Sequence, residues 1–113
     1  MTQDFKWKDS EKKIANRVYE RARLSELGEL IRSFKTEAAA IADPDQLWNL
    51  IEEMKTRRYA FEQKYDYRYS VLITVFARLV GEGRISEIDL QGIDSEKINA
   101  ILRASRFFCS NIN

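Results

Sequence analysis

The chain has 113 residues, of which 44% are hydrophobic and 33% charged, the composition of a helix-rich domain that folds in water. Its 19 basic and 18 acidic residues nearly cancel, so no net charge attracts it to nucleic acid or to an anionic membrane. The length fits one domain, and the longest apolar stretch, residues 71–80, is about half of the ~20 residues that a membrane-spanning helix needs.

The residue types also argue against several classes of chemistry. The chain contains no histidine, which is the most frequent general base and a common metal ligand. We therefore expect no catalytic site, metal, cofactor or small-molecule substrate. The single cysteine, Cys109, cannot form an internal disulfide, which favours a reducing compartment. The N-terminal residues lack the apolar core of a signal peptide, so we expect a cytoplasmic protein.

The first predicted element is a long helix over residues 10–42. The spacing of its apolar residues alternates between three and four, as in the seam of a coiled coil. These residues are Leu24, Leu27, Ile31, Phe34, Ala38 and Ile41. Gly28 lies inside this pattern, at a cost of roughly 1 kcal/mol relative to alanine.

The sequence Asp43-Pro44-Asp45-Gln46 predicts the end of this helix and the start of a second. Asp43 can cap the new helix, Pro44 suits its first position, and Gln46 completes a capping box. With no breaker before Gly81, the pattern predicts a continuous helix over residues 44–80, roughly 55 Å long. Its predicted seam is Ile51, Met54, Arg58, Phe61, Tyr65, Arg68, Leu72, Val75 and Leu79.

The stretch KYDYRYS, residues 64–70, lies inside this second predicted helix, directly before the apolar run VLITVFA. We interpret it as the place where the helix passes from a solvated, paired region into a small helical head. Tyrosine suits such a border because it combines an apolar ring with a polar tip. Short helices are predicted over residues 84–108, one capped by Ser86 and one by Asp94 or Ser95. Ile98, Ile101, Leu102 and Phe107 are expected to face inward.

The length of the second predicted helix suggests a homodimer. A compact monomer of this size is roughly 26–30 Å across, so a ~55 Å helix with an apolar seam would project and need another helix to cover it. A second copy is the simplest cover, and arginine within a seam can fix register. The predicted dimer interface is Leu27, Ile31, Phe34, Leu50, Ile51, Met54, Arg58, Phe61 and Tyr65.

The basic and aromatic residues of the second predicted helix suggest two alternative binding functions. Stacking platforms for nucleic acid interleave these residue types, but the acidic residues of the same helix cancel the positive charge, so we expect no nucleic-acid binding. Trp48, with Glu52 one turn later, has the composition of a protein–protein hot spot. Alternatively, Trp48 packs against the turn at residues 43–44 or on the partner helix.

The second predicted helix resembles the signature region of the fluorescence recovery proteins of cyanobacteria. The sequence from Leu47 to Gly83 shares most of that family's conserved pattern, and KYDYRYS is its most specific part. The matching residues are Leu47, Trp48, Leu50, Arg57, Arg58, Lys64, Tyr65, Asp66, Arg68, Ser70, Ile73, Val75, Phe76, Ala77, Leu79, Glu82 and Gly83.

The resemblance implies an all-α homodimer of long antiparallel helices with a small C-terminal head. It also implies a non-enzymatic function: binding the photoactivated orange carotenoid protein, through that protein's C-terminal domain, and accelerating its return to the inactive orange form. This would end quenching of the phycobilisome, a thylakoid-associated antenna. The partner-binding residues that it implies are Leu47, Trp48, Glu52, Arg58 and Phe76.

The sequence also departs from the family pattern. Ile51 replaces a histidine, Glu52 keeps the acid as glutamate, and Thr74 replaces an aromatic residue of the apolar run. Some members of the family occur in organisms without the carotenoid protein. The alternative function is therefore a dimeric helical adaptor of the same fold that serves a different protein partner.

Overall fold

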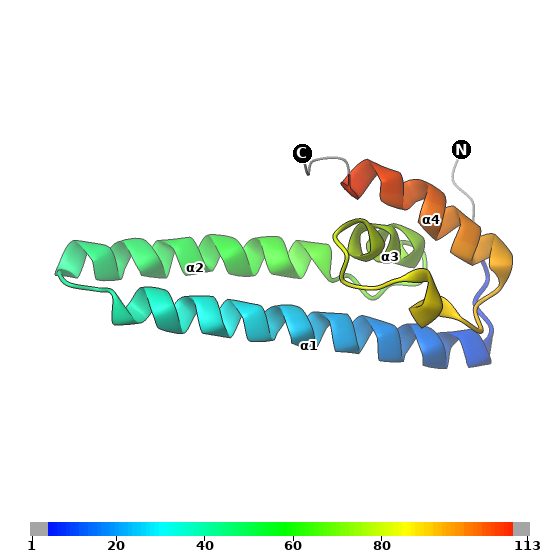
Figure 1. Ribbon diagram of the computed structural model, residues 1–113, viewed down its shortest axis with the longest axis horizontal. Helices are drawn as coiled ribbons and strands as arrows, with labels where there is room; N and C mark the ends of the chain where they lie inside the picture. The colour runs from blue at the N-terminus through cyan, green and yellow to red at the C-terminus, as the bar shows by residue number, and fades with distance from the viewer. Residues whose placement is uncertain (1–4, 110–113) are drawn as a thin grey trace. The chain divides into compact units, whose positions relative to one another are not determined.

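The computed structural model describes residues 5–109, and its regular elements are all helices (Figure 1). This confirms the all-α prediction. In chain order the elements are α1 (Asp9–Ala39), α2 (Pro44–Lys64), α3 (Leu72–Gly81), the short 3-10 helix η1 (Glu87–Leu90) and α4 (Ser95–Cys109). The described residues divide into two compact units. We call residues 5–22 with 66–109 the head unit, and Arg23–Tyr65 the arm unit.

The arm unit is a helical hairpin made of the second half of α1 and all of α2 (Figure 1). Asp43 ends the turn between them by accepting a hydrogen bond from the backbone N–H of Gln46 at 2.9 Å, and Pro44 follows at the first helical position. Gln46 in turn accepts a bond from the backbone N–H of Ala42 at 2.6 Å. Both predicted capping residues therefore act at this turn.

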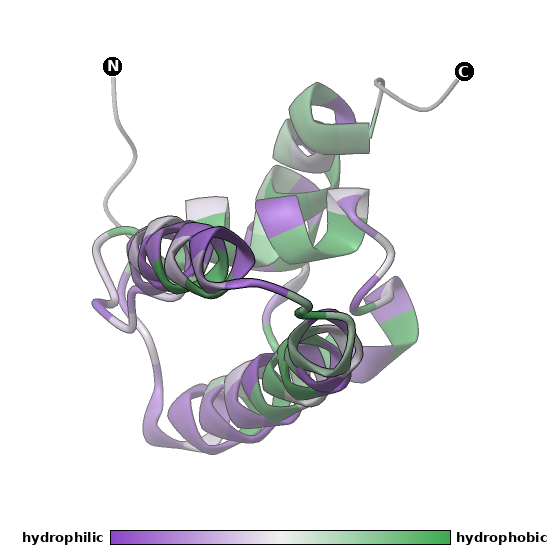
Figure 2. Cartoon of the chain, turned by 90° about the vertical axis from the view of Figure 1, so that its left-hand side faces the viewer, coloured by the Kyte–Doolittle hydropathy of each residue, from purple (hydrophilic) through white to green (hydrophobic). Residues whose placement is uncertain are grey.

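The head unit has α3 at its centre, and hydrophobic residues predominate in this helix, whereas long parts of α1 and α2 are hydrophilic (Figure 2). Leu72, Phe76 and Leu79 are fully buried. The packing of α3 on α4 depends on Gly81, because a Cβ there would lie 2.6 Å from Cβ of Phe108 and 2.8 Å from the carbonyl oxygen of Ser105. Only glycine allows this close approach.

A buried ion pair joins the start of α1 to the start of α4 within the head unit. Glu11 is 1% exposed and lies 3.1 Å from Nζ of Lys97, which is also buried. The carboxylate accepts two backbone N–H bonds as well, from Lys8 at 2.9 Å and Asp94 at 2.8 Å. Nζ of Lys97 also lies 5.4 Å from the ring of Trp7. These donors keep the pKa of Glu11 low although burial opposes the charged form.

The prediction of one continuous helix over residues 44–80 is wrong. Helix α2 ends at Lys64, and residues 65–71 separate it from α3. Side-chain contacts outweigh local helix propensity here. Within the arm unit, Glu26 receives hydrogen bonds at 2.7 Å from both Nζ of Lys64 and the hydroxyl of Tyr65. Within the head unit, the ring centroid of Tyr67 lies 4.7 Å from that of Tyr19, a contact that buries aromatic area.

The break removes the length argument for a dimer, because α2 has 21 residues and spans roughly 32 Å instead of ~55 Å. A second correction concerns α4. Ile101 is buried as predicted, but Phe107 is 82% exposed and does not face inward. Ser86 caps η1 as predicted, in a capping box with Asp89.

Candidate partner-binding surface

One face of α2 exposes large hydrophobic and charged side chains together. Trp48 is 60% exposed, and its neighbours along the helix at spacings of four, three and four are Glu52, Lys55 and Tyr59. Residues at this spacing lie on one side of a helix. We call this face the Trp48 surface; its members are Leu47, Trp48, Ile51, Glu52, Lys55, Arg58 and Tyr59, all exposed.

The ion pairs of the Trp48 surface join residues of α2 that are three or four positions apart. Nζ of Lys55 lies 3.1 Å from the Glu52 carboxylate, and Nε of Arg58 lies 3.1 Å from the Glu62 carboxylate. Both are solvent-exposed pairs, each worth at most about 1 kcal/mol. A binding partner can therefore replace these ion pairs with its own contacts at a small cost in free energy, which suits a recognition surface.

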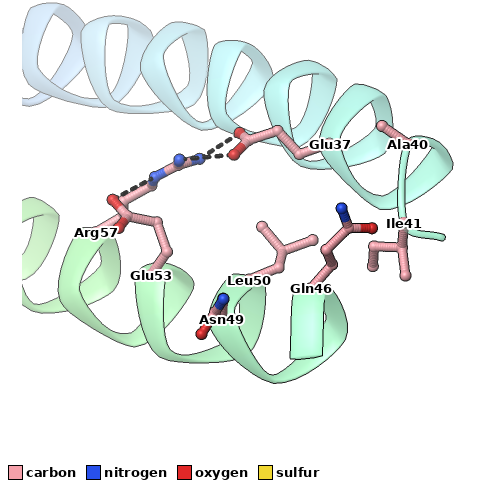
Figure 3. Close-up of a pocket in the computed structure, with 8 residues that line it drawn as sticks. All are labelled: Glu37, Ala40, Ile41, Gln46, Asn49, Leu50, Glu53 and Arg57. Atoms are coloured by element: carbon pink, nitrogen blue, oxygen red, sulfur yellow. Dashed lines mark hydrogen bonds and ion pairs between the residues drawn. The ribbon is translucent and has the colours of Figure 1, made fainter. Parts of the chain in front are cut away.

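The opposite side of α2 faces α1 and is anchored by Arg57 (Figure 3). Its guanidinium binds Glu37 through two bonds of 2.7 and 2.9 Å, and its Nε lies 3.3 Å from the Glu53 carboxylate. The bond from Arg57 lowers the pKa of Glu37 to about 2, and the pKa of Arg57 is raised. A bidentate pair of this kind fixes how α2 lies on α1.

A cavity of about 430 Å³ lies between this anchor and the turn (Figure 3). Its lining residues are Glu37, Ala40, Ile41, Gln46, Asn49, Leu50, Glu53 and Arg57. The arginine already binds two carboxylates. The charged groups of this cavity are therefore already paired with one another, and the pair between Arg57 and Glu37 holds the hairpin together.

The observed inner side of α2 differs from the predicted seam by one residue at the position of its arginine. Arg57, which lies outside the predicted seam, makes the contact with α1, while the side chain of Arg58, predicted to lie in the seam, is 79% exposed. Leu50, Met54, Arg57, Phe61 and Lys64 follow the observed inner side, at spacings of four and three. The spacing of the apolar residues alone cannot decide which of two adjacent arginines faces α1. The available signal was the carboxylate at position 37, which lies opposite position 57 in an antiparallel hairpin.

Four of the predicted dimer residues do come together, in an apolar groove of about 390 Å³ in the arm unit. Leu27, Ile31 and Phe34 contribute from α1, and Met54 contributes from α2. Leu30 and Lys35 complete the lining, and Leu30 was missed because it falls outside the strict seam. We call this feature the arm groove.

Three other predicted site residues are buried inside the chain. Phe76, predicted to contact a partner, is fully buried in the head unit. Leu50 and Tyr65 are buried within the arm unit, which leaves them little surface for a second copy. Phe61 is half-buried, with its ring centroid 4.7 Å from that of Tyr65. Tyr59, by contrast, is exposed and lies three turns after Trp48 on the same face, as the helical spacing predicts.

Residues 5–109 contain no group of acidic residues and cysteine arranged to hold a metal ion. In the same range, no helix is both long enough and apolar enough to cross a membrane.

The comparisons with known proteins agree with this architecture. Residues 7–104 match the family model described as "Photoprotection regulator fluorescence recovery protein". The fluorescence recovery protein of Synechocystis sp. PCC 6803 is 30% identical over 105 residues, covering 93% of this chain and 96% of that protein.

Solved structures of two relatives show the same fold. The structure of the fluorescence recovery protein of Fremyella diplosiphon matches with a TM-score of 0.84 at 33% identity, covering 89% of this chain and 99% of that one. The Synechocystis structure matches with a TM-score of 0.84 at 31% identity and the same coverage. The chain therefore belongs to the fluorescence recovery protein family of photoprotection regulators.

Proposed function

We propose that this protein is a homodimer that binds the photoactivated orange carotenoid protein and accelerates its return to the inactive orange form. It would act in the cytoplasm, at the thylakoid-associated phycobilisome, and would end quenching without covalent chemistry. Such a regulator must bind the reverting or inactive conformation better than the active one. The observation that carries the proposal is the Trp48 surface on a chain of this family.

The Trp48 surface has the composition of a protein-binding hot spot. It combines an exposed tryptophan and tyrosine with Arg58, and these three residue types dominate measured binding energies at interfaces. The bidentate pair between Arg57 and Glu37 on the other side of the helix gives this surface a rigid support. A rigid surface loses little conformational entropy when it binds.

The arm groove supports the homodimer. Ile31 is 54% exposed, and Leu24 and Phe34 on the same helix are also exposed. An apolar face of this kind on two long helices is normally covered by another helix. A second copy brings an identical apolar face, so a two-fold arrangement covers both at once.

The test is the dark recovery of a photoconverted orange carotenoid protein, followed by its absorbance with substoichiometric amounts of this protein. We expect the wild type to accelerate recovery. Trp48→Ala should reduce the acceleration at least tenfold, because a central tryptophan contributes about 2 kcal/mol or more at an interface. Alanine is the best helix former, so α2 should stay folded.

Phe107→Ala is the matched control, because Phe107 is an even more exposed aromatic residue on the head unit. It should leave the acceleration unchanged. If Trp48→Ala retains full activity, Trp48 does not belong to the binding site. If a folded wild-type protein gives no acceleration, the partner assignment fails.

A second candidate function is favoured by one observation. Ile51, which replaces the histidine of the family pattern, is exposed on the Trp48 surface next to Glu52. An apolar side chain there suits a partner different from the one that a histidine would meet. In that case the protein is a dimeric adaptor for another protein, and Ile51→His should then restore acceleration that the wild type lacks.

A further inference from the structure

The cavity between the Arg57 anchor and the turn of the arm unit, which we call the tip cavity, shares no residue with the Trp48 surface or the arm groove. Its volume of about 430 Å³ lies within the range of sites that hold a ligand. Ile41 and Leu50 give it an apolar wall, and Leu50 is 8% exposed. The side chains of Leu50 and Gln46 reach from α2 towards α1 (Figure 3).

The charged groups that line the tip cavity do not balance. Two carboxylates, those of Glu37 and Glu53, share the single guanidinium of Arg57. Arg57 donates two bonds of 2.7 and 2.9 Å to Glu37, but one bond of 3.3 Å to Oε2 of Glu53. Within residues 5–109, Oε1 of Glu53 accepts no hydrogen bond. The cavity therefore has one excess negative charge, which is centred on Glu53.

The end of α1 adds to this negative potential. Helix α1 ends at Ala39, and both Glu37 in its last turn and the following Ala40 line the cavity. The carbonyl groups at the C-terminus of a helix carry a partial negative charge, which a basic residue in the last turn can compensate. The last turn of α1 contains no basic residue. A cation in the tip cavity would therefore be attracted both by Glu53 and by the end of α1.

We propose that the tip cavity binds an arginine side chain of the protein that contacts the Trp48 surface. The planar guanidinium of an arginine can donate two parallel bonds to a carboxylate, here that of Glu53. Its apolar stem can pack on Ile41 and Leu50.

The position of the cavity on α2 favours the same partner. Asn49 lines the tip cavity, is exposed, and directly follows Trp48 in the chain. One partner segment that crosses the start of α2 can therefore contact both sites. The source of the arginine rests on the proposed function, whereas the preference of the cavity for a cation does not.

The test is an NMR titration of the full chain with the small peptide acetyl-leucyl-arginine amide, followed through the backbone amide shifts. We expect saturable shifts at residues 40–41, 49–50 and 53. The matched peptide carries citrulline in place of arginine, which has nearly the same shape without the charge. It should bind at least two- to fivefold more weakly, roughly as expected for the loss of one exposed ion pair.

Glu53→Gln tests the residue that attracts the cation. It removes the excess charge but keeps the two bonds between Arg57 and Glu37 and a similar helix propensity, so the hairpin should stay folded. We expect it to weaken binding of the arginine peptide about two- to fivefold.

Glu62→Gln is the matched control. The side chains of Glu53 and Glu62 are 55% and 58% exposed, and each pairs with an arginine four positions away on α2. Because Glu62 does not line the tip cavity, its substitution should leave binding of the arginine peptide unchanged. If both peptides bind equally well, or if the shifts occur around Trp48 and not at the cavity, the proposal is overturned.

The recovery assay tests the source of the arginine. Glu53→Gln should reduce the acceleration of recovery by about two- to fivefold. If the wild type accelerates recovery and Glu53→Gln is fully active, the partner does not use the tip cavity and the proposal is overturned. If the wild type gives no acceleration but the arginine peptide still binds at the cavity, the proposed partner fails and the assignment of the cavity stands.

Discussion

The head unit and the arm unit differ in how many of their hydrophobic side chains are buried. Among residues 5–109, fourteen of the sixteen buried hydrophobic side chains lie in the head unit, and the other two, Leu50 and Tyr65, lie in the arm unit. Conversely, seven of the ten exposed large hydrophobic side chains belong to the arm unit. The head unit buries its own core, whereas the arm unit leaves apolar surface that another molecule can cover.

We therefore expect the head unit to determine the stability of the chain and the arm unit to determine its association with other molecules. Substitutions of the buried side chains of the head unit should change the free energy of unfolding of the chain itself. Substitutions of the exposed apolar side chains of the arm unit should change association, because these side chains contact solvent in the single chain. The same type of substitution should therefore have a different effect in the two units.

The largest expected contrast is between two phenylalanines of the head unit, one buried and one exposed. Phe76→Ala should lower the free energy of unfolding by about 3–5 kcal/mol, because it opens a cavity around a fully buried ring. Phe107→Ala should change it by less than about 0.5 kcal/mol. Urea unfolding measures both, and equal effects would mean that the burial of α3 has been misassigned.

The next contrast is between a buried and an exposed ion pair. Glu11→Ala should cost about 3 kcal/mol, because it leaves Lys97 buried with only Asp94, at 3.8 Å, as a distant partner. Glu52→Ala, which breaks the exposed pair with Lys55, should cost less than about 1 kcal/mol. Thermal or urea unfolding of both variants is the measurement. A small loss for Glu11→Ala would argue against its role in joining α1 to α4.

Two glycines should respond with opposite sign. Gly81→Ala should destabilise by about 1–3 kcal/mol, since the new Cβ would collide with Phe108 and with the Ser105 carbonyl. Gly28→Ala, in the arm unit, meets only the end of Arg32 at 3.5 Å. It should stabilise α1 by about 0.5–1 kcal/mol, because alanine is the better helix former. Two destabilised variants would contradict the description of the arm.

The smallest expected effect concerns pH and the anchor of the arm unit. The pKa of Glu37 is lowered to about 2 by Arg57, from about 4.5 in the unfolded chain. Because the pKa is lower in the folded state, this contribution to stability is complete above about pH 4.5 and is lost as the pH falls towards 2.

Carboxyl carbon NMR measures this titration directly. The midpoint of Glu37 should be near 2 and should rise in Arg57→Gln. Arg58→Gln, at the exposed neighbour that pairs with Glu62, should leave it unchanged. An unshifted midpoint in the wild type would show that the pair with Arg57 does not persist in solution.

Local signals in the sequence were enough to locate the caps and the helical class. Asp43, Pro44 and Ser86 act at helix ends because capping depends on a few neighbouring residues. The helix predicted over residues 10–42 is observed as Asp9–Ala39. Uncertainty of one to three residues at helix ends is usual because the last turns fray.

The sequence could not predict the features that depend on distant contacts. The end of α2 at Lys64 depends on Glu26, 38 residues earlier, and on aromatic contacts with the start of α1. The choice between Arg57 and Arg58 as the anchor depends on where Glu37 lies. In each case a tertiary contact overrides a periodic pattern.

The most direct test of the account is the mass of the particle in solution, measured by light scattering at micromolar concentration. The exposed arm groove predicts twice the chain mass of 13.3 kDa for the wild type. Ile31→Glu, which places a charge in the groove, should give the mass of one chain with its helices intact. A wild-type protein that is folded and monomeric would contradict the claim that a second copy covers the arm unit.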